Sequence, residues 1–96
     1  MKNKTYRSDK WLKAVREIPV CVGCHRYLPI EAAHRNEGKG LGMKTDDCAT
    51  AALCHECHHE IDNGKNLTRE ERRDLMNRYI VLTLIQLVRM GKVKPV

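Results

Sequence analysis

Residues 54–62 read C-H-E-C-H-H-E-I-D, and residues 21–24 read C-V-G-C. Each stretch contains a CxxC knuckle, which places two thiolates within reach of one tetrahedral Zn²⁺. A redox role is disfavoured, because there are two copies and no βαβ pattern surrounds them. The pair therefore predicts a structural zinc site with four ligands, Cys21, Cys24, Cys54 and Cys57. Such a site would staple a chain of 96 residues, which is too short to build a large core.

One cysteine and two histidines lie close to the knuckles without a place in this set. Cys48 is expected to pack as a small buried hydrophobe. His25 and His55 could each replace a thiolate ligand, but a complete set of four cysteines makes this unnecessary.

The composition favours a soluble, folded, basic domain. Lys and Arg number 18 against 12 acids, a formal net charge of +6, which fits either affinity for nucleic-acid phosphates or an ordinary solvated surface. Charges interrupt every stretch that could be long enough to span a membrane, and the start of the chain lacks the apolar core of a signal peptide. We therefore expect no membrane association and a cytoplasmic location, where thiols stay reduced.

The patterning predicts one small α+β domain over residues 1–96. Local signals divide the chain into a flexible basic arm at 1–8, a short helix at 10–17 capped by Ser8 or Asp9, a zinc-stapled core at 20–63 and a long helix at 68–90. Within the core we expect a hairpin in residues 27–34 with Pro29 near its turn or edge, a loop at 35–47, a strand at 48–53 and a helix at 55–62 closed by Asn63-Gly64.

The last helix carries the clearest signals. Thr68 and Glu71 form a T-x-x-E capping box, and Gly91 is a typical stop. Residues 79–88 are apolar nearly all round, which indicates burial on more than one side. The second covering surface is either this domain or a partner chain, so a homodimer through this helix is one expectation.

Cys57 is followed directly by His58, and Asp62 lies four residues further on. Positions four apart share one helix face, where an imidazole and a carboxylate can hold a divalent metal. An ordinary surface pair at this spacing is the other interpretation.

Taken in order, these features resemble the HNH endonucleases, which have the ββα-metal or His-Me finger fold. The order is a knuckle, Ala33-His34, a Gly/Lys-rich loop G-K-G-L-G-M-K-T-D-D, a short strand, and the run C-H-H-E-I-D from Cys57. The resemblance covers Cys21 to Asp62 and is nearest to small prophage-encoded nucleases of the YbcO type.

The resemblance implies a metal-dependent DNA endonuclease. His34 takes the place of the general base that activates water, and His58 and Asp62 take the two helix-borne positions for Mg²⁺ or another divalent cation. Arg35 is a candidate for holding a phosphate oxygen. Lys39 and Lys44 are candidates for contacts with the DNA backbone.

Two positions depart from the family pattern. Ala33 stands where many members have a further metal ligand, so the metal would rely on His58, Asp62, waters and phosphate oxygens, or recruit another group such as His59 or Asp47. Ala49 stands where the family's middle Asn orients the base, which leaves Asp47, or alternatively Asp46, to hold His34 in its reactive tautomer. Two other functions stay open, a non-catalytic zinc module that binds nucleic acid or protein, and an RNA-directed nuclease or toxin.

Overall fold

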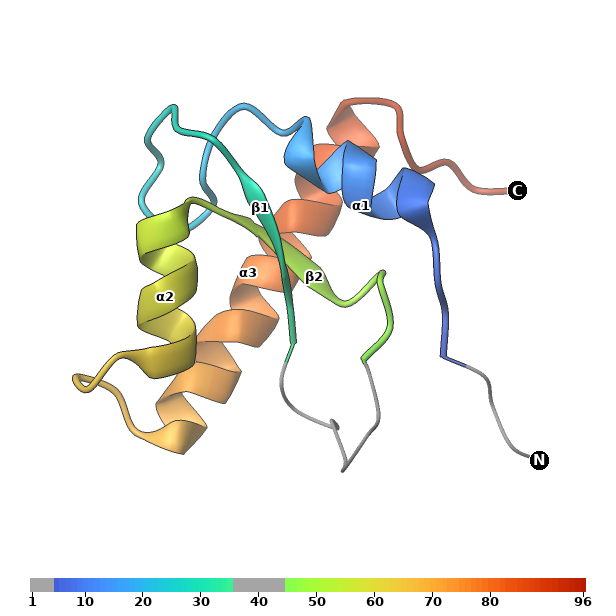
Figure 1. Cartoon of the computed structure of the whole chain (residues 1–96). Coiled ribbons are helices and arrows are strands. Elements are labelled where there is room, and N and C mark those ends of the chain that lie inside the picture. Colours follow the sequence, from blue (N-terminus) through green and yellow to red (C-terminus); the bar gives the residue numbers. More distant parts are fainter. Residues whose placement is uncertain (1–4, 36–44) are drawn as a thin grey trace.

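The computed structural model of the chain describes residues 5–35 and 45–96, which form three helices and two strands (Figure 1). In chain order these are α1 (Asp9–Arg16), β1 (Glu31–His34), β2 (Thr50–Leu53), α2 (His55–Asn63) and α3 (Arg69–Arg89). The predicted α+β class is confirmed. In Figure 1, α1 and α2 lie towards opposite ends of the two-stranded sheet, and α3 passes behind it. In the described part of the chain, no helix is long and apolar enough to cross a membrane.

The helix ends lie where the capping signals predict them. The Ser8 hydroxyl accepts from the Trp11 N–H and begins α1, so Ser8 rather than Asp9 is the cap. At α3 the capping box is complete, with the Thr68 N–H donating to Glu71 Oε1 at 2.9 Å and the Glu71 N–H to Thr68 Oγ1 at 3.1 Å. Gly91 ends α3 with a φ of +74°, which allows the Lys92 N–H to reach the Leu87 carbonyl.

The hairpin expected within residues 27–34 is wrong, because only its second half is a strand. β1 pairs antiparallel with β2, in the register Glu31 with Leu53 and His34 with Thr50. Residues 27–30 are not part of a strand, and Tyr27 is 80% exposed. Pro29 lacks the N–H that a strand needs for its ladder, so pairing begins only after it. The long loop expected at 35–47 lies mostly outside the described residues.

The edge of β2 that faces away from β1 is covered by a side chain of α3 and by the backbone at Val22. The Ala52 N–H donates to Thr83 Oγ1 of α3 at 2.9 Å, and the Ala52 carbonyl accepts from the Val22 N–H at 3.0 Å. Thr83 in turn donates to the Tyr79 carbonyl within its own helix. A buried threonine therefore docks α3 on the sheet and removes an open strand edge.

The core is built from small and aliphatic residues. Ala33 and Ala51, partners across the two strands, are fully buried, so neighbouring elements can approach the sheet closely. Around them pack the largest buried apolar side chains, which are Val15, Ile18, Leu53 and Leu87. α3 covers this core on one side only. Val81, Leu84, Ile85 and Val88 remain exposed, so the described residues do not bury residues 79–88 on several sides.

Candidate metal centre and active site

The four cysteines of the two knuckles meet where the 21–24 turn packs against the start of α2. Their sulfur atoms all lie within 4.8 Å of one another, and Cys24 Sγ is 3.9 Å from Cys54 Sγ. Sulfurs arranged tetrahedrally around Zn²⁺ at about 2.3 Å are about 3.8 Å apart. Cys21, Cys24, Cys54 and Cys57 could therefore hold a metal ion such as zinc, as the sequence predicts.

Two of these sulfurs, those of Cys21 and Cys24, accept hydrogen bonds from nearby N–H groups. Backbone N–H groups of Gly23 and Cys24 donate to Cys21 Sγ at 3.3 and 3.5 Å. Hydrogen bonds from the Arg26 side chain and backbone lower the pKa of Cys24 to about 6. Burial, together with the neighbouring cysteine sulfurs, raises the pKa of Cys57. Four thiolates this close together would repel one another, and a bound divalent ion removes that cost.

Gly23 allows the two knuckles to approach each other. A Cβ at this position would lie 3.2 Å from Cys57 Sγ and 3.3 Å from Leu53 Cδ2, closer than ordinary van der Waals contact. The glycine of C-V-G-C is therefore explained by the packing of the first knuckle on a ligand of the second.

The remaining cysteine and two nearby histidines are not part of the cluster. His25 is exposed and has a φ of +62°, and His55 is exposed with its Nδ1 3.1 Å from Glu31 Oε2. The prediction that Cys48 is buried is wrong, since it is exposed. Cys48 follows Asp47 in the turn before β2, and Asp47 is the residue of that turn whose side chain points inward.

His34, at the end of β1, is held by a buried carboxylate. Its Nε2 lies 2.8 Å from Asp47 Oδ1, and Asp47 is only 2% exposed. The neighbouring Asp46 is exposed and accepts instead from the Tyr6 N–H at 2.7 Å. Of the two aspartates that the sequence left open, Asp47 is therefore the one in contact with His34.

Two residues of the amino-terminal segment complete the surroundings of Asp47. Arg7 donates to Oδ1 at 2.8 Å, and the Ser8 N–H donates to Oδ2 at 2.7 Å. Burial alone would raise the pKa of Asp47, but the hydrogen bonds from His34, Ser8 and Arg7 outweigh it and lower the pKa to about 2. The carboxylate is thus charged at neutral pH, with its oxygens committed to these donors, which leaves it poorly placed as the extra metal ligand.

These contacts involve part of the predicted basic arm. Residues 1–4 lie outside the described residues, whereas Tyr6, Arg7 and Ser8 are hydrogen-bonded to the turn at Asp46 and Asp47. The sequence analysis missed this role for Arg7 and Ser8, because nothing in the local pattern links residues about 40 positions apart.

His58 and Asp62 point towards each other on α2, with His58 Nε2 3.2 Å from Asp62 Oδ2. The other ring nitrogen, Nδ1, lies 2.7 Å from Glu31 Oε1 of β1. Hydrogen bonds from His58 and His55 lower the pKa of Glu31, so it is a charged acceptor. A histidine that binds a metal through one nitrogen usually donates its other N–H to a carboxylate. Glu31, which the sequence analysis did not select, therefore gives His58 the surroundings typical of a metal ligand.

The strand β1 connects the two groups. Glu31 contacts His58 near the start of the strand, and His34 contacts Asp47 at its end. Residues three apart along a strand are separated by about 10 Å. Their side chains also leave opposite faces of the strand, so the structure does not bring His34 into direct contact with His58.

The other predicted site residues lie as follows. Arg35, directly after His34, is half-buried and donates to Asn77 Oδ1 of α3 at 3.4 Å. His59 is exposed on α2. Lys39 and Lys44 lie outside the described residues. Ala33, the position at which the resemblance would place a further metal ligand, is fully buried and belongs to the core.

Comparisons with known proteins were made at three levels. None of the protein-family models matches this chain, no curated protein matches its sequence, and no solved structure matches its fold. The functional assignment therefore depends on the residues and geometry described above.

Proposed function

We propose that this chain is a metal-dependent endonuclease of the HNH kind, which hydrolyses phosphodiester bonds of DNA. The observation that carries the proposal is that β1 holds both His34, which is paired with Asp47, and Glu31, which orients His58 beside Asp62. A base and a metal-binding pair near one sheet are the two components that hydrolysis of a phosphodiester needs.

His34 would act as the general base. When its Nε2–H donates to Asp47, the lone pair is on Nδ1, which can take a proton from water. The water oxygen then attacks phosphorus, and the 3′ oxygen leaves. Asp47 is a positioning residue, since it fixes the tautomer and stabilises the imidazolium after proton transfer.

His58 and Asp62 would hold the catalytic cation, Mg²⁺ or another divalent ion, which when bound supplies positive charge beside the phosphate oxygens. The 3.2 Å between His58 Nε2 and Asp62 Oδ2 suits two ligands of one ion. Glu31 keeps the His58 ring in place. Zinc at the four cysteines would be structural, as it has no open coordination position.

Plasmid nicking in the presence of Mg²⁺ or Mn²⁺ tests this proposal. We expect the wild type to nick DNA, and His34→Ala to lose roughly 10²- to 10⁴-fold in rate while remaining folded. His58→Ala should lose activity and binding of the second metal, whereas Glu60→Gln, at an exposed position of the same helix, is the control and should retain both. Equal nicking by wild type and His34→Ala would remove the general-base assignment.

A non-catalytic zinc module that binds nucleic acid is the second candidate. Buried Ala33 favours it, because this chain has no ligand at a position where many family members have one. In that case DNA binding is salt-sensitive and indifferent to His34→Ala, and no DNA in a panel of duplex, nicked, branched and single-stranded substrates is cut.

A further inference from the structure

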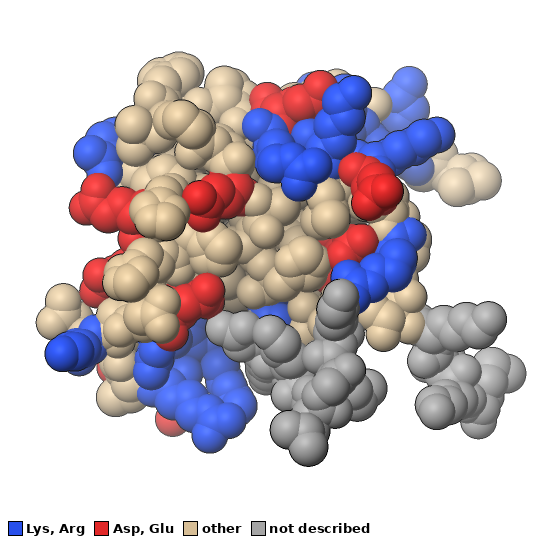
Figure 2. Space-filling model, viewed as in Figure 1, with Lys and Arg blue, Asp and Glu red and all other residues tan. Residues whose placement is uncertain are grey.

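A basic hollow lies between the end of β1, the end of α2 and the start of α3. Its volume is about 250 Å³, and it is lined by Arg35, Ile61, Asp62, Arg69, Arg72, Arg73 and Met76. Figure 2 shows Lys and Arg gathered on this part of the surface, over the start of α3. Four arginines and one aspartate leave the lining strongly positive. The volume is below the range usual for whole small-molecule ligands, so a single anionic group is the better match.

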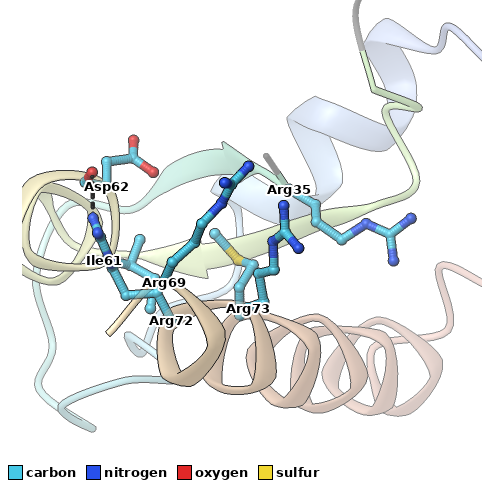
Figure 3. A pocket seen from close by; sticks show the side chains of 7 residues that line it. Arg35, Ile61, Asp62, Arg69, Arg72 and Arg73 are labelled. Carbon is cyan, nitrogen blue, oxygen red and sulfur yellow. Dashed lines mark hydrogen bonds between the residues drawn. The ribbon is translucent and has the colours of Figure 1, made fainter. Parts of the chain in front are cut away.

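In the first turns of α3, the basic and the acidic side chains lie on different faces of the helix. Arg69, Arg72 and Arg73 line the hollow at spacings of three and four, and Met76 continues the same face. Figure 3 shows Arg69 and Arg73 rising from α3 and Arg72 reaching towards α2. The acidic residues of these turns, Glu70, Glu71 and Asp74, are exposed and do not line the hollow. Like charges at these spacings destabilise a helix, and an anion between them would reverse this cost.

Two of these arginines have a buried donor without a partner. Arg72 uses one terminal nitrogen to donate to the Asp62 carbonyl at 3.1 Å, the bond drawn in Figure 3, and Arg35 donates to Asn77. The Nε atoms of both side chains are buried and make no hydrogen bond within the described parts of the chain, residues 5–35 and 45–96. A buried donor that is left unpaired costs about 1–3 kcal/mol, so these positions are unusual unless a ligand accepts from them.

We propose that this hollow binds a backbone phosphate of a nucleic-acid strand, next to the phosphate that is cleaved. Guanidinium groups match phosphate oxygens in geometry and charge. Two residues tie the hollow to the site above, since Asp62 belongs to both and Arg35 directly follows His34. The choice of a nucleic-acid phosphate rather than a free one rests on the proposed function, whereas the anion site itself rests on the arginines.

DNA binding by the zinc-loaded full chain, without added Mg²⁺, tests the proposal by fluorescence anisotropy. The variant is Arg69→Gln with Arg73→Gln, since glutamine keeps the helix propensity. The matched control is Arg78→Gln, an exposed arginine of α3 that does not line the hollow and lies about two and a half turns after Arg69, on the opposite face of the helix. Losing one phosphate contact should reduce the slope of log K against log salt by about 0.9 and weaken binding roughly eightfold at 0.1 M salt.

We expect this loss in the double variant and not in Arg78→Gln, with both variants folded by circular dichroism. Equal binding by variant and control would overturn the proposal. Added inorganic phosphate should compete with DNA for the wild type at lower concentrations than for the double variant. If inorganic phosphate bound the wild type more tightly than the double variant while both proteins bound DNA equally well, the assignment to nucleic acid would be overturned.

Nicking assays keep this inference separate from the proposed function. A wild type that binds DNA through the hollow but never cuts would contradict the endonuclease and leave the phosphate site standing. A wild type that cuts, with the double variant binding and cutting equally well, would contradict the phosphate site alone.

Discussion

Replacing Asp47 by asparagine tests the central contact of the candidate site. The carboxylate is 2% exposed and accepts from His34, Arg7 and Ser8. Its pKa falls from an ordinary 3.8 to about 2 on folding, which corresponds to about 2 kcal/mol of stability at pH 7. Asp47→Asn removes the charge, so we expect a destabilisation of about this size.

The lowered pKa of Asp47 also determines how its contribution to stability changes with pH. The pKa of Asp47 is lower in the folded state, so its contribution is fully present above pH 4 and is lost as pH falls through about 2. Protonation of the thiolates would release zinc well before pH 3, so the comparison is made between pH 7 and pH 5, where the difference in unfolding free energy between wild type and Asp47→Asn should stay at about 2 kcal/mol. Urea unfolding, followed by circular dichroism with zinc present, measures this difference.

Asp46→Asn is the matched control. Asp46 is the adjacent carboxylate, but it is exposed, with a hydrogen bond from the Tyr6 N–H. We expect it to cost well under about 1 kcal/mol and to leave DNA nicking unchanged, whereas Asp47→Asn should slow nicking by disturbing the tautomer of His34. Equal effects of the two substitutions, or a difference for Asp47→Asn that falls well below about 2 kcal/mol between pH 7 and pH 5, would refute the reasoning.

Three other outcomes can be measured. Cys57→Ser should lose zinc, measured by elemental analysis, and unfold the domain, whereas Cys48→Ser, at the exposed cysteine, should change neither. Gly23→Ala should weaken zinc retention against a chelator, because its methyl group would crowd Cys57 Sγ at 3.2 Å, and unchanged retention would contradict the packing argument. The apolar side chains exposed on α3 should hold two copies together weakly, so Leu84→Glu should lower the molar mass seen by sedimentation, and a monomeric wild type would rule this out.

The sequence predicts those features that depend on near neighbours. The CxxC spacing, the capping box at Thr68 and the stop at Gly91 are local signals, and each has the predicted place in the structure. The prediction for β1 is wrong because residues 27–34 contain enough local signals for a hairpin. The true partner, β2, comes only after a long connection.

The same contrast between local signals and contacts distant in the sequence applies to the candidate site. His58 and Asp62 could be paired from their spacing alone. The contacts of Glu31 with His58 and of Arg7 with Asp47 join residues 27 and 40 positions apart, and no periodicity reports them. The arginines at the start of α3 carried a readable signal, the i, i+3, i+4 spacing of Arg69, Arg72 and Arg73, but only the fold shows that they face Arg35.

The hydrogen bond between Ala52 and Thr83 also bears on how easily the chain associates with other chains while it is being synthesised. The two residues are 31 positions apart, so at 5–20 residues per second a ribosome takes roughly 2–6 s to add Thr83 after Ala52. During that interval the edge of β2 has no α3 to cover it, and an uncovered strand edge is a template for association with other nascent chains. A substitution that removes the Thr83 hydroxyl would extend this exposure beyond synthesis, because the Ala52 N–H would lose its partner on α3.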